Sequence, residues 1–474
     1  MSYYNSYNNL KYLIIVGDYE DVPSNCYMNS YVSDLDYGIQ EAKTDDTADL
    51  FRGRLSVSSS QEAIDVIDKI RLYEMFPPTT FAPKGMHVSC FLSKISPIGY
   101  EDGRAVLTSE EIRDALQSDY SKTITRVYSK NGNFQPTHWN DGDYANGEEI
   151  PYELQNLPWN GNSANIALQI NNGLHYIYYH AHSDAQSWTS PNFTIDNINS
   201  LSPRTDNAYP IVFSMGCQNG KFNISECFAE ALLRRSNKGS VGIFAHSADS
   251  YFGESEAMAE GLFFSIWPNT KLIPVFPSIS TPSYNPMPEP VYRLGEILDA
   301  GALRLEEFYG YSYYEHRITH LLGDPTMYFN TDNPTGFNNT QIICNSNAIT
   351  ANTGGDVATI TFYNTSTNTV RSFVGLGKTV PYTTENTKVC ISAHNKIPLI
   401  CNYNNGSLYI QKDNIKNNRE YRANKVILGS EVTSQHDTGS INIIFGKTTI
   451  YATEVELYGE TIVGTGAELE IIPQ

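Results

Sequence analysis

The sequence predicts an α/β domain with a mainly parallel sheet, followed by two all-β segments. Strand-like apolar runs alternate with helix-like segments as far as about residue 330, which is the pattern of βα units. Beyond Thr331 the chain changes to short alternating runs with Asn, Thr and Gly turns. A length of 474 residues also exceeds what one hydrophobic core usually fills. We place the domain boundaries to give segments 1–85, 86–332, 333–405 and 406–474.

The α/β part begins with an apolar run at Lys11–Val16, closed by Gly17-Asp18, which we expect to be a strand buried on both faces of the sheet. Apolar residues at helical spacing behind a Ser and an early Glu predict a capped helix over Ser60–Tyr73. The same reasoning predicts strands at Met86–Leu92, His175–Tyr179, Pro210–Met215 and Ser240–Ala245, and helices at Ser109–Gln117 (with a Ser cap) and Glu226–Arg234.

The two C-terminal segments differ in their pattern. Residues 333–405 have the short strands and polar turns of a β-sandwich. Residues 406–474 show a period of two with Gly and Asn turns, which predicts either stacked β-hairpins or a small β-solenoid.

The charge balance limits the classes of partner. A formal net charge of −20 argues against nucleic acid, since no surplus of basic residues exists to neutralise phosphates. An acidic loop is a candidate for structural Ca²⁺; the residues in question are Asp34, Asp36, Asp45 and Asp46. No run approaches 18 apolar residues, so we expect no transmembrane segment, and no signal peptide is recognisable.

The seven cysteines are scattered at positions 26, 90, 217, 227, 344, 390 and 401. Their spacing gives neither a disulfide framework nor a paired zinc motif. The odd number leaves at least one thiol free.

Two reactive side chains, His182 and Cys217, follow predicted strands. Sites in α/β sheets form beyond the carboxyl ends of strands, so these side chains are expected to meet there. A thiol becomes a nucleophile when an imidazole takes its proton and backbone N–H groups await the oxyanion. Taken alone, however, a cysteine is more often a buried structural residue and a histidine a satisfied core residue.

A zinc site is an alternative. His180, His182 and Asp184 have the spacing that opens the metallo-β-lactamase motif H-x-H-x-D-H. Such a hydrolase needs three protein ligands and an activated water. The final histidine of the motif is replaced by Ala185.

Two motifs resemble the gingipain family of caspase-like cysteine proteases. The first is an aromatic residue, a Gly-His-Gly-Ser loop, then Trp, Phe and Leu; its counterparts here are Tyr179, His182, Trp188, Phe193 and Leu201. This alignment pairs the catalytic histidine of the family with His182 rather than His180. The second motif corresponds to Gly216–Phe222 (GCQNGKF) followed by Cys227–Leu232 (CFAEAL).

Other segments agree with this resemblance, which covers roughly residues 10 to 405. They are Tyr12–Pro23, Gly53–Leu55 and Gly323–Pro325. The resemblance implies a caspase-like catalytic domain and an immunoglobulin-like sandwich at 333–405. It also implies a secreted or cell-surface cysteine endopeptidase, monomeric, with peptide or protein substrates and no catalytic cofactor.

The resemblance assigns further residues. Cys217 is the nucleophile and His182 its base, and the backbone around Ser183 and Gly216 binds the oxyanion. The pocket for the P1 side chain is expected from His180, Met215, Phe252 and Glu256.

The chain departs from the family pattern at three places. Lys94 falls where an acidic residue orients the histidine, although Glu101 or Asp102 could substitute for it. The aspartate that selects arginine would fall near Ala105. The first strand and helix units of the family are missing before Lys11, so we expect a fragment of a longer precursor. A non-catalytic binding or adhesin-like protein on the same scaffold is therefore a further alternative.

Overall fold

The computed structural model describes residues 10–27, 30–39, 48–78, 80–92, 103–139, 148–268, 289–309, 313–345, 347–381, 386–415, 417–432, 439–444 and 446–473. The chain divides into two compact units. The first comprises Met1–Tyr73 and Thr80–Asn333, and the second Glu74–Thr79 and Pro334–Gln474. The chain thus crosses into the second unit for a short segment before it returns to the first.

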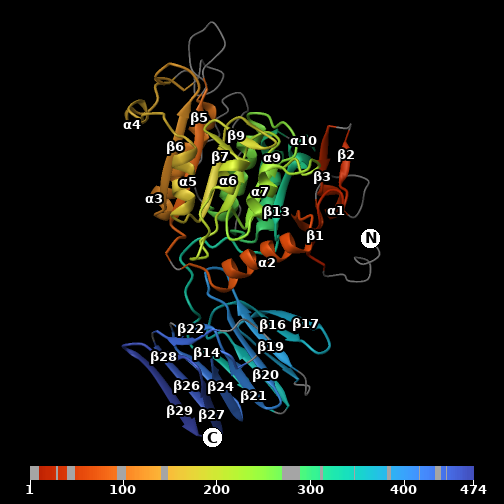
Figure 1. Cartoon of the computed structure of the whole chain (residues 1–474), viewed down its shortest axis with the longest axis vertical. Coiled ribbons are helices and arrows are strands. Elements are labelled where there is room, and N and C mark those ends of the chain that lie inside the picture. The colour runs from red at the N-terminus through yellow and green to blue at the C-terminus, as the bar shows by residue number, and fades with distance from the viewer. Residues whose placement is uncertain are drawn as a thin grey trace. The chain divides into compact units, whose positions relative to one another are not determined.

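The first unit is built on an eight-stranded sheet (Figure 1). Its order is β1 (Tyr12–Val16), β4 (Phe51–Leu55), β13 (Thr319–Gly323), β12 (Gly242–His246), β11 (Ile211–Ser214), β7 (Tyr176–His180), β5 (Lys84–Phe91) and β6 (Thr123–Lys130). All neighbours pair in parallel except β13 and β12. The sheet is therefore mixed, and its mainly parallel character confirms the prediction from the alternating elements.

Strand β1 differs from the expectation in its burial. It pairs only with β4 and forms one edge of the sheet. Ile14 and Val16 are 40% and 53% exposed. The prediction of a strand buried on both faces is therefore wrong, because a continuous apolar run does not reveal whether a strand lies at the centre or at the edge of a sheet.

Helices cover both faces of this sheet (Figure 1). Adjacent residues of β7 point to opposite faces: the ring of Tyr178 contacts Phe263 of α8, whereas the ring of Tyr179 stacks on Trp188, which in turn contacts Phe228 of α7. The helices are α1 (Leu35–Gly38), α2 (Ser60–Met75), α3 (Arg104–Tyr120), α4 (Tyr152–Gln155), α5 (Ser163–Asn171), α6 (Ile195–Asn199), α7 (Phe228–Arg234), α8 (Glu254–Ile266), α9 (Leu294–Tyr309) and α10 (Tyr313–Ile318).

Helix α3 begins earlier than the sequence predicted. It starts at Arg104, so Ser109 lies within the helix and is not its cap. The Ser109 hydroxyl donates to the carbonyl of Ala105, four residues earlier, at 2.8 Å. This back-bond satisfies the hydroxyl inside a helix, which is why the serine does not mark a helix start.

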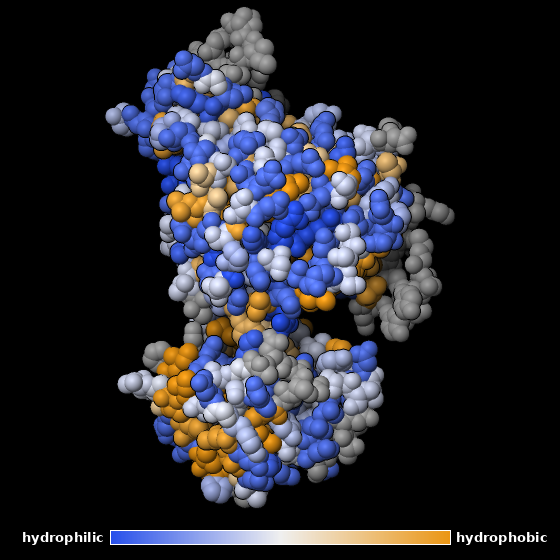
Figure 2. All heavy atoms as spheres, in the orientation of Figure 1, coloured by the Kyte–Doolittle hydropathy of each residue, from blue (hydrophilic) through white to orange (hydrophobic). Residues whose placement is uncertain are grey.

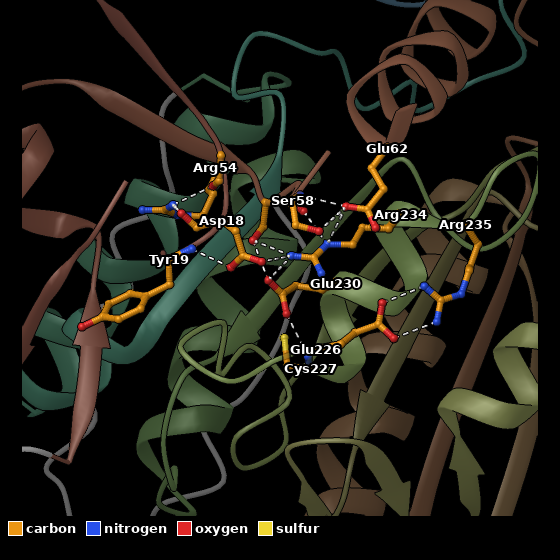
Figure 3. Close-up of polar contacts among 12 residues, drawn as sticks. Asp18, Tyr19, Arg54, Ser58, Glu62, Glu226, Cys227, Glu230, Arg234 and Arg235 are labelled. Carbon is orange, nitrogen blue, oxygen red and sulfur yellow. Dashed lines mark hydrogen bonds and ion pairs between the residues drawn. The ribbon is translucent and has the colours of Figure 1, made fainter. Parts of the chain in front are cut away.

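Helix α7 is tied to the rest of the unit by buried charges (Figure 3). The guanidinium of Arg234 donates to Asp18 at 2.8 Å and to Glu230 at 2.7 Å, and its Nε donates to the carbonyl of Ser56. Burial raises the pKa of Glu230 to about 7, although Arg234 opposes this shift. The second carboxylate oxygen of Glu230 accepts from the N–H of Cys227, which fixes the start of α7.

Two small sheets complete the first unit. A hairpin joins β2 (Asn25–Tyr27) to β3 (Tyr31–Ser33), and a three-stranded sheet contains β8 (Ser183–Asp184), β9 (Ser187–Thr189) and β10 (Asn192–Thr194). The second small sheet immediately follows β7, and Trp188 of β9 stacks on Tyr179 of β7. No helix in the described part of the chain is long and apolar enough to cross a membrane.

The second unit contains three sheets. The first has the order β18 (Gly377–Pro381), β15 (Ala348–Asn352), β14 (Thr340–Cys344), β23 (Arg419–Arg422), β26 (Gly446–Ala452) and β29 (Ala467–Pro473). The second has the order β17 (Thr369–Gly375), β16 (Ala358–Asn364), β19 (Thr387–Ser392), β20 (Leu399–Asn404), β21 (Ser407–Ile410), β24 (Lys425–Gly429) and β27 (Glu454–Tyr458). The third is β22 (Asp413–Ile415), β25 (Ile441–Ile443) and β28 (Thr461–Val463).

One hydrophobic core joins these sheets. It includes Ile342 and Ile360 from the first two sheets, and Ile415 and Ile450 from the C-terminal strands. The boundary that we placed between residues 405 and 406 thus falls inside a continuous core.

From β22 onward every ladder is parallel. Hairpins would pair antiparallel, so the parallel ladders have the pairing of a chain that winds in successive coils. The last strands of the unit, β27, β28 and β29, expose apolar side chains, among them Leu457, Ile462, Val463 and Ile471. Figure 2 shows an orange area over part of this unit.

Candidate active site

The histidine and cysteine loops leave the sheet at neighbouring positions. Strands β7 and β11 are parallel neighbours, with Tyr179 opposite Ser214. His182 and Cys217 each lie three residues beyond this pair. The N–H of Met215 donates to the carbonyl of Tyr179 at 2.9 Å, so the register continues past the strand ends. The two strand ends adjoin, as the sequence predicted.

A direct hydrogen bond joins the two loops. The hydroxyl of Ser183 donates to the carbonyl of Cys217 at 2.7 Å. Gly216 makes this approach possible, because a Cβ on it would lie 2.2 Å from Ser183 Oγ. A side chain at position 216 would therefore push the histidine loop away from the cysteine loop.

The side chain of Asn219 also joins the histidine and cysteine loops, and it is fully buried. Its Nδ2 donates to the carbonyls of Asp184 at 2.7 Å and Ser187 at 3.3 Å, and its Oδ1 accepts from the Ser214 hydroxyl at 2.7 Å. The indole N–H of Trp188 donates in turn to Ser214 Oγ at 2.9 Å. These bonds make the ends of β7 and β11 and the β8–β9 turn one rigid structure.

The Cys217 thiol is half-buried at the edge of this structure. Its Sγ lies 3.7 Å from the carbonyl oxygen of Ser250 and 4.0 Å from the Ser250 hydroxyl. Burial raises the pKa of Cys217, and the negative charge of Asp249 adds to this shift. The thiol is therefore protonated at neutral pH, and a base must remove its proton before it can attack a carbonyl.

The residue after Cys217 marks a sharp turn. Gln218 has a φ of +60°, in the left-handed region, and its N–H donates to the carbonyl of Ala248. A left-handed residue directly after Cys217 turns the following chain away from the thiol and is a form of backbone strain that clusters at functional sites.

The side chain of His182 is exposed. Its backbone carbonyl accepts hydrogen bonds from the N–H of Thr189 at 3.1 Å and the Thr189 hydroxyl at 2.6 Å, which holds the loop in place. Its ring lies 5.9 Å from the ring of Phe252, centroid to centroid. Lys94, Glu101 and Asp102, the sequence candidates for the orienting position, lie outside the described residues.

Most of the residues that we predicted to line the P1 pocket are buried. His180, Met215 and Glu256 are buried, and of the four predicted residues only Phe252 reaches the surface. Glu256 accepts a hydrogen bond from the N–H of Gly253 and so caps the start of α8. The prediction that Glu256 lines the pocket is wrong, because its position three residues after the N-cap, Gly253, turns the carboxylate inward to the helix N-terminus.

His180 belongs to the same buried layer. Its Nδ1 lies 3.2 Å from the hydroxyl of Tyr178, and its Nε2 lies 3.7 Å from the carboxylate of Glu256. Burial lowers the pKa of His180 to about 3, so the ring is neutral at physiological pH. Of the two histidines, only His182 has a side chain that is open to solvent.

The predicted metal ligands have other partners. Among the described residues no group of three or more His, Cys, Asp or Glu side chains is placed to hold a metal ion. Asp184 accepts from the N–H of Gln186 and the hydroxyl of Ser187, while His180 is buried, so the zinc alternative is not favoured.

The described carboxylates of the predicted Ca²⁺ loop also have partners within the protein. Asp34 forms an ion pair with buried Arg54, and Asp36 accepts from Asn25 and lies 3.2 Å from Arg317. Asp45 and Asp46 lie outside the described residues. The two described carboxylates therefore balance arginines within the protein and are not grouped around a Ca²⁺ position.

Sequence reasoning missed the residues that hold the junction together, above all Asn219 and Ser250. The Asn-Gly pair after Cys217 was visible as part of a motif, but its role depends on contacts with the β8–β9 turn. Ser250 offered no signal, since it comes from a loop 33 residues further along the chain.

Comparison with known proteins supplies the family. The model of peptidase family C25 matches residues 1–330. Gingipain R2 from Porphyromonas gingivalis is 25% identical over 234 residues, which cover 49% of this chain and 27% of that protein. Lys-gingipain HG66 from the same organism is 24% identical over 226 residues, which cover 47% of this chain and 11% of that protein. The chain thus spans only about a quarter or less of these curated relatives.

Solved structures show the same fold. The crystal structure of the Arg-specific cysteine proteinase gingipain R aligns with a TM-score of 0.62 and 20% identity, covering 85% of each chain. A complex of the pro- and mature domains of a Porphyromonas gingivalis gingipain aligns with a TM-score of 0.63 and 18% identity, covering 85% of this chain and 87% of that one. The first unit thus has the caspase-like arrangement of a mixed sheet with helices.

Proposed function

Because the chain belongs to peptidase family C25, the gingipain-type cysteine peptidases, we propose that it is a cysteine endopeptidase with Cys217 as nucleophile and His182 as general base and acid. One observation carries this assignment. The two loops are joined by the bond from Ser183 to the Cys217 carbonyl at the ends of adjacent parallel strands. An exposed imidazole and a half-buried thiol on such a junction support the proposal that a proton passes between them when a peptide is bound.

The reaction begins with removal of the Cys217 proton by His182. The thiolate attacks the carbonyl carbon of the peptide bond and forms a tetrahedral oxyanion. His182 then returns the proton to the leaving amine, the C–N bond breaks, and a thioester remains on Cys217. A water molecule gives a proton to His182 and attacks the thioester, which releases the carboxylic product and restores the thiol.

Backbone N–H groups of this junction are the proposed oxyanion donors. The candidates are the N–H groups around Gly216–Cys217 and Ser183. Their positions are fixed because Asn219 and Ser183 bond the two loops together. Preorganised donors stabilise the developing charge without reorganising during the reaction, and this is a large part of catalysis in such sites.

Phe252 is partly exposed next to His182 and is the proposed contact for the P1 side chain. No catalytic metal or cofactor is needed for this chemistry. We also propose that the protein acts as a monomer on peptide or protein substrates, at the cell surface or outside the cell. The support for this location is the likeness to gingipains rather than any feature of the chain.

The second unit is proposed as an accessory module. The facing sheets of residues 333–405 are consistent with an immunoglobulin-like sandwich. The parallel ladders of residues 406–474 are consistent with a small β-solenoid that continues the same core.

Covalent labelling tests the proposed function. A peptidyl acyloxymethyl ketone is expected to alkylate Cys217 at least about ten times faster than any of the other six free cysteines. Digestion and mass spectrometry identify the modified residue, and iodoacetamide, which carries no peptide, measures the intrinsic reactivity of each thiol. Absence of selective labelling at Cys217 would favour a binding protein on the same scaffold.

Replacement of Asn219 with alanine is expected to lower kcat about 10- to 100-fold with a smaller change in KM. The variant loses the bonds to Asp184 and Ser187, so the two loops can separate. We expect a loss of about 1–3 kcal/mol of stability, because buried acceptors are left unpaired. Kinetics and denaturant unfolding measure the two effects.

The matched control for Asn219 is Asn197→Ala, which removes the capping-box bond from the N–H of Thr194 to the Asn197 side chain at the start of α6. It is expected to cost about 1 kcal/mol of stability without changing kcat. Equal losses of kcat in both variants would show that Asn219 acts only through stability.

A further inference from the structure

Four tyrosine rings form a continuous row beside the cysteine loop. The ring centroid of Tyr251 lies 5.7 Å from that of Tyr314, which lies 5.2 Å edge-on from that of Tyr31. Tyr31 stacks on Tyr27 at 5.2 Å. The rings come from the loop before α8, from α10 and from the β2–β3 hairpin, and Figure 1 shows that hairpin next to α10. Segments that are far apart in the sequence thus build one aromatic surface, which we call the tyrosine row.

Polar contacts of Tyr314 and Tyr27 hold the tyrosine row in place. The hydroxyl of Tyr314 donates to the carbonyl of Asp249 at 2.8 Å. The guanidinium of Arg317 lies 4.5 Å from the ring centroid of Tyr27, and the Tyr27 hydroxyl donates to Asp36. Burial and the carboxylate of Asp36 raise the pKa of Tyr27 to about 12, so its hydroxyl keeps its proton. These contacts preorganise the row.

The row is not part of the hydrophobic core. Tyr251 is 60% exposed, and Tyr27, Tyr31 and Tyr314 are half-buried. Aromatic rings that are stacked and partly open to solvent keep contact area available for a ligand ring.

The row also begins next to a residue that contacts the Cys217 thiol. Tyr251 directly follows Ser250, whose carbonyl and hydroxyl are the polar neighbours of Cys217 Sγ. Since consecutive Cα atoms are about 3.8 Å apart, the backbone of Tyr251 lies next to that of Ser250 and therefore close to the thiol. Side chains on one side of an extended peptide repeat about every 6.6 Å, which is close to the spacing of the rings.

We propose that the tyrosine row is a substrate subsite that holds an aromatic side chain of the peptide, two or more residues away from the bond that is cut. The inference rests on the proposed peptidase function. An added ring at Tyr251 extends the row with the edge-on or offset geometry that its members already have. Because the row is fixed before binding, only the substrate loses freedom, so the contact yields about a two- to tenfold preference for an aromatic residue.

The test is a scan of matched octapeptides. Cleavage of a peptide library first identifies a sequence that the protein cuts. Phe or Ala is then placed at each position on either side of the bond, and kcat/KM is measured for every pair. We expect one position, two to four residues from the bond, at which the Phe peptide is cut about fivefold better than the Ala peptide.

Variants connect that preference to the row. In Tyr251→Ala the ratio of kcat/KM for the Phe and Ala peptides is expected to fall from about five to about one. The control is Tyr152→Ala on α4, a tyrosine that is 79% exposed and outside the row, which is expected to keep the ratio. An unchanged ratio in Tyr251→Ala, or a preference for Lys or Arg over Phe at the same position, would overturn the proposal.

Measurements of peptide binding test the tyrosine row independently of the proposed peptidase activity. If the wild-type protein cuts no peptide, the peptidase function fails, and fluorescein-labelled octapeptide pools with one fixed Phe or Ala then test the row alone by fluorescence anisotropy. A roughly fivefold tighter Kd for one Phe pool, lost in Tyr251→Ala, would retain the row as a peptide-binding site. Equal affinity for all pools would refute it.

Discussion

Replacing Cys217 with alanine is expected to lower kcat/KM on peptide substrates by at least about 1,000-fold. The thiol supplies the attacking atom in the proposed reaction, and the next cysteine along the chain, Cys227 at the start of α7, is fully buried. Because the side chain is small and only half-buried, we expect the melting temperature to stay within about 3 °C of the wild type. Steady-state kinetics and thermal unfolding measure the two effects.

The matched control is Cys390→Ala, which removes another half-buried thiol but in the second unit. It is expected to leave kcat/KM unchanged. Full activity of Cys217→Ala would eliminate Cys217 as the nucleophile. If that activity were then lost to a zinc chelator, a metal-dependent reaction at His182 would become the better explanation.

Replacing Arg234 with methionine is expected to destabilise the protein by about 3–5 kcal/mol. The guanidinium donates to Asp18, Glu230 and the carbonyl of Ser56, and its removal leaves two carboxylates without their cation in a buried site (Figure 3). Denaturant unfolding measures the loss. We also expect lower peptidase activity, since Glu230 fixes the start of α7, where the N–H of Phe228 donates to the carbonyl of Ala185 in the histidine loop.

The neighbouring residue is the control. Arg235 forms a two-bond ion pair with Glu226 at 2.7 and 2.8 Å, but both side chains are about a quarter exposed. Arg235→Met is therefore expected to cost less than about 1 kcal/mol. The double variant Arg234→Met/Glu230→Gln should recover part of the lost stability, because the side chain at position 230 is then neutral and needs no cation. Equal losses for Arg234→Met and Arg235→Met would refute the role of the buried network.

Local sequence patterns predicted most elements of the first unit but not their environment. Apolar runs marked β5, β7, β11 and β12 to within a few residues, because a strand that is covered on both faces must be apolar throughout. The same signal failed for β1, whose apolar run lies at the sheet edge. Ser109 likewise has a residue type typical of helix starts, yet it back-bonds inside α3.

The sequence predicted some features of the candidate site but not others. Position along the chain was enough to bring His182 and Cys217 to adjacent strand ends, since parallel strands present their carboxyl ends at one edge. The pocket was not predictable, because the burial of Glu256 depends on how α8 begins at Gly253. The contact of Ser250 with the thiol depends on a loop that follows a different strand, β12.

The sequence by itself determined the α/β class of the first unit, the family resemblance and the choice of His182 and Cys217 as the proposed pair, because these depend on residue type and spacing along the chain. The tertiary structure alone decided which side chains share a surface. Asn219 reaching the β8–β9 turn, Arg234 meeting Asp18, and four tyrosines from three segments forming a row are all contacts between distant parts of the chain. The physical reason is that burial and pairing are set by what packs against a residue, and that neighbour is not recorded in the local sequence.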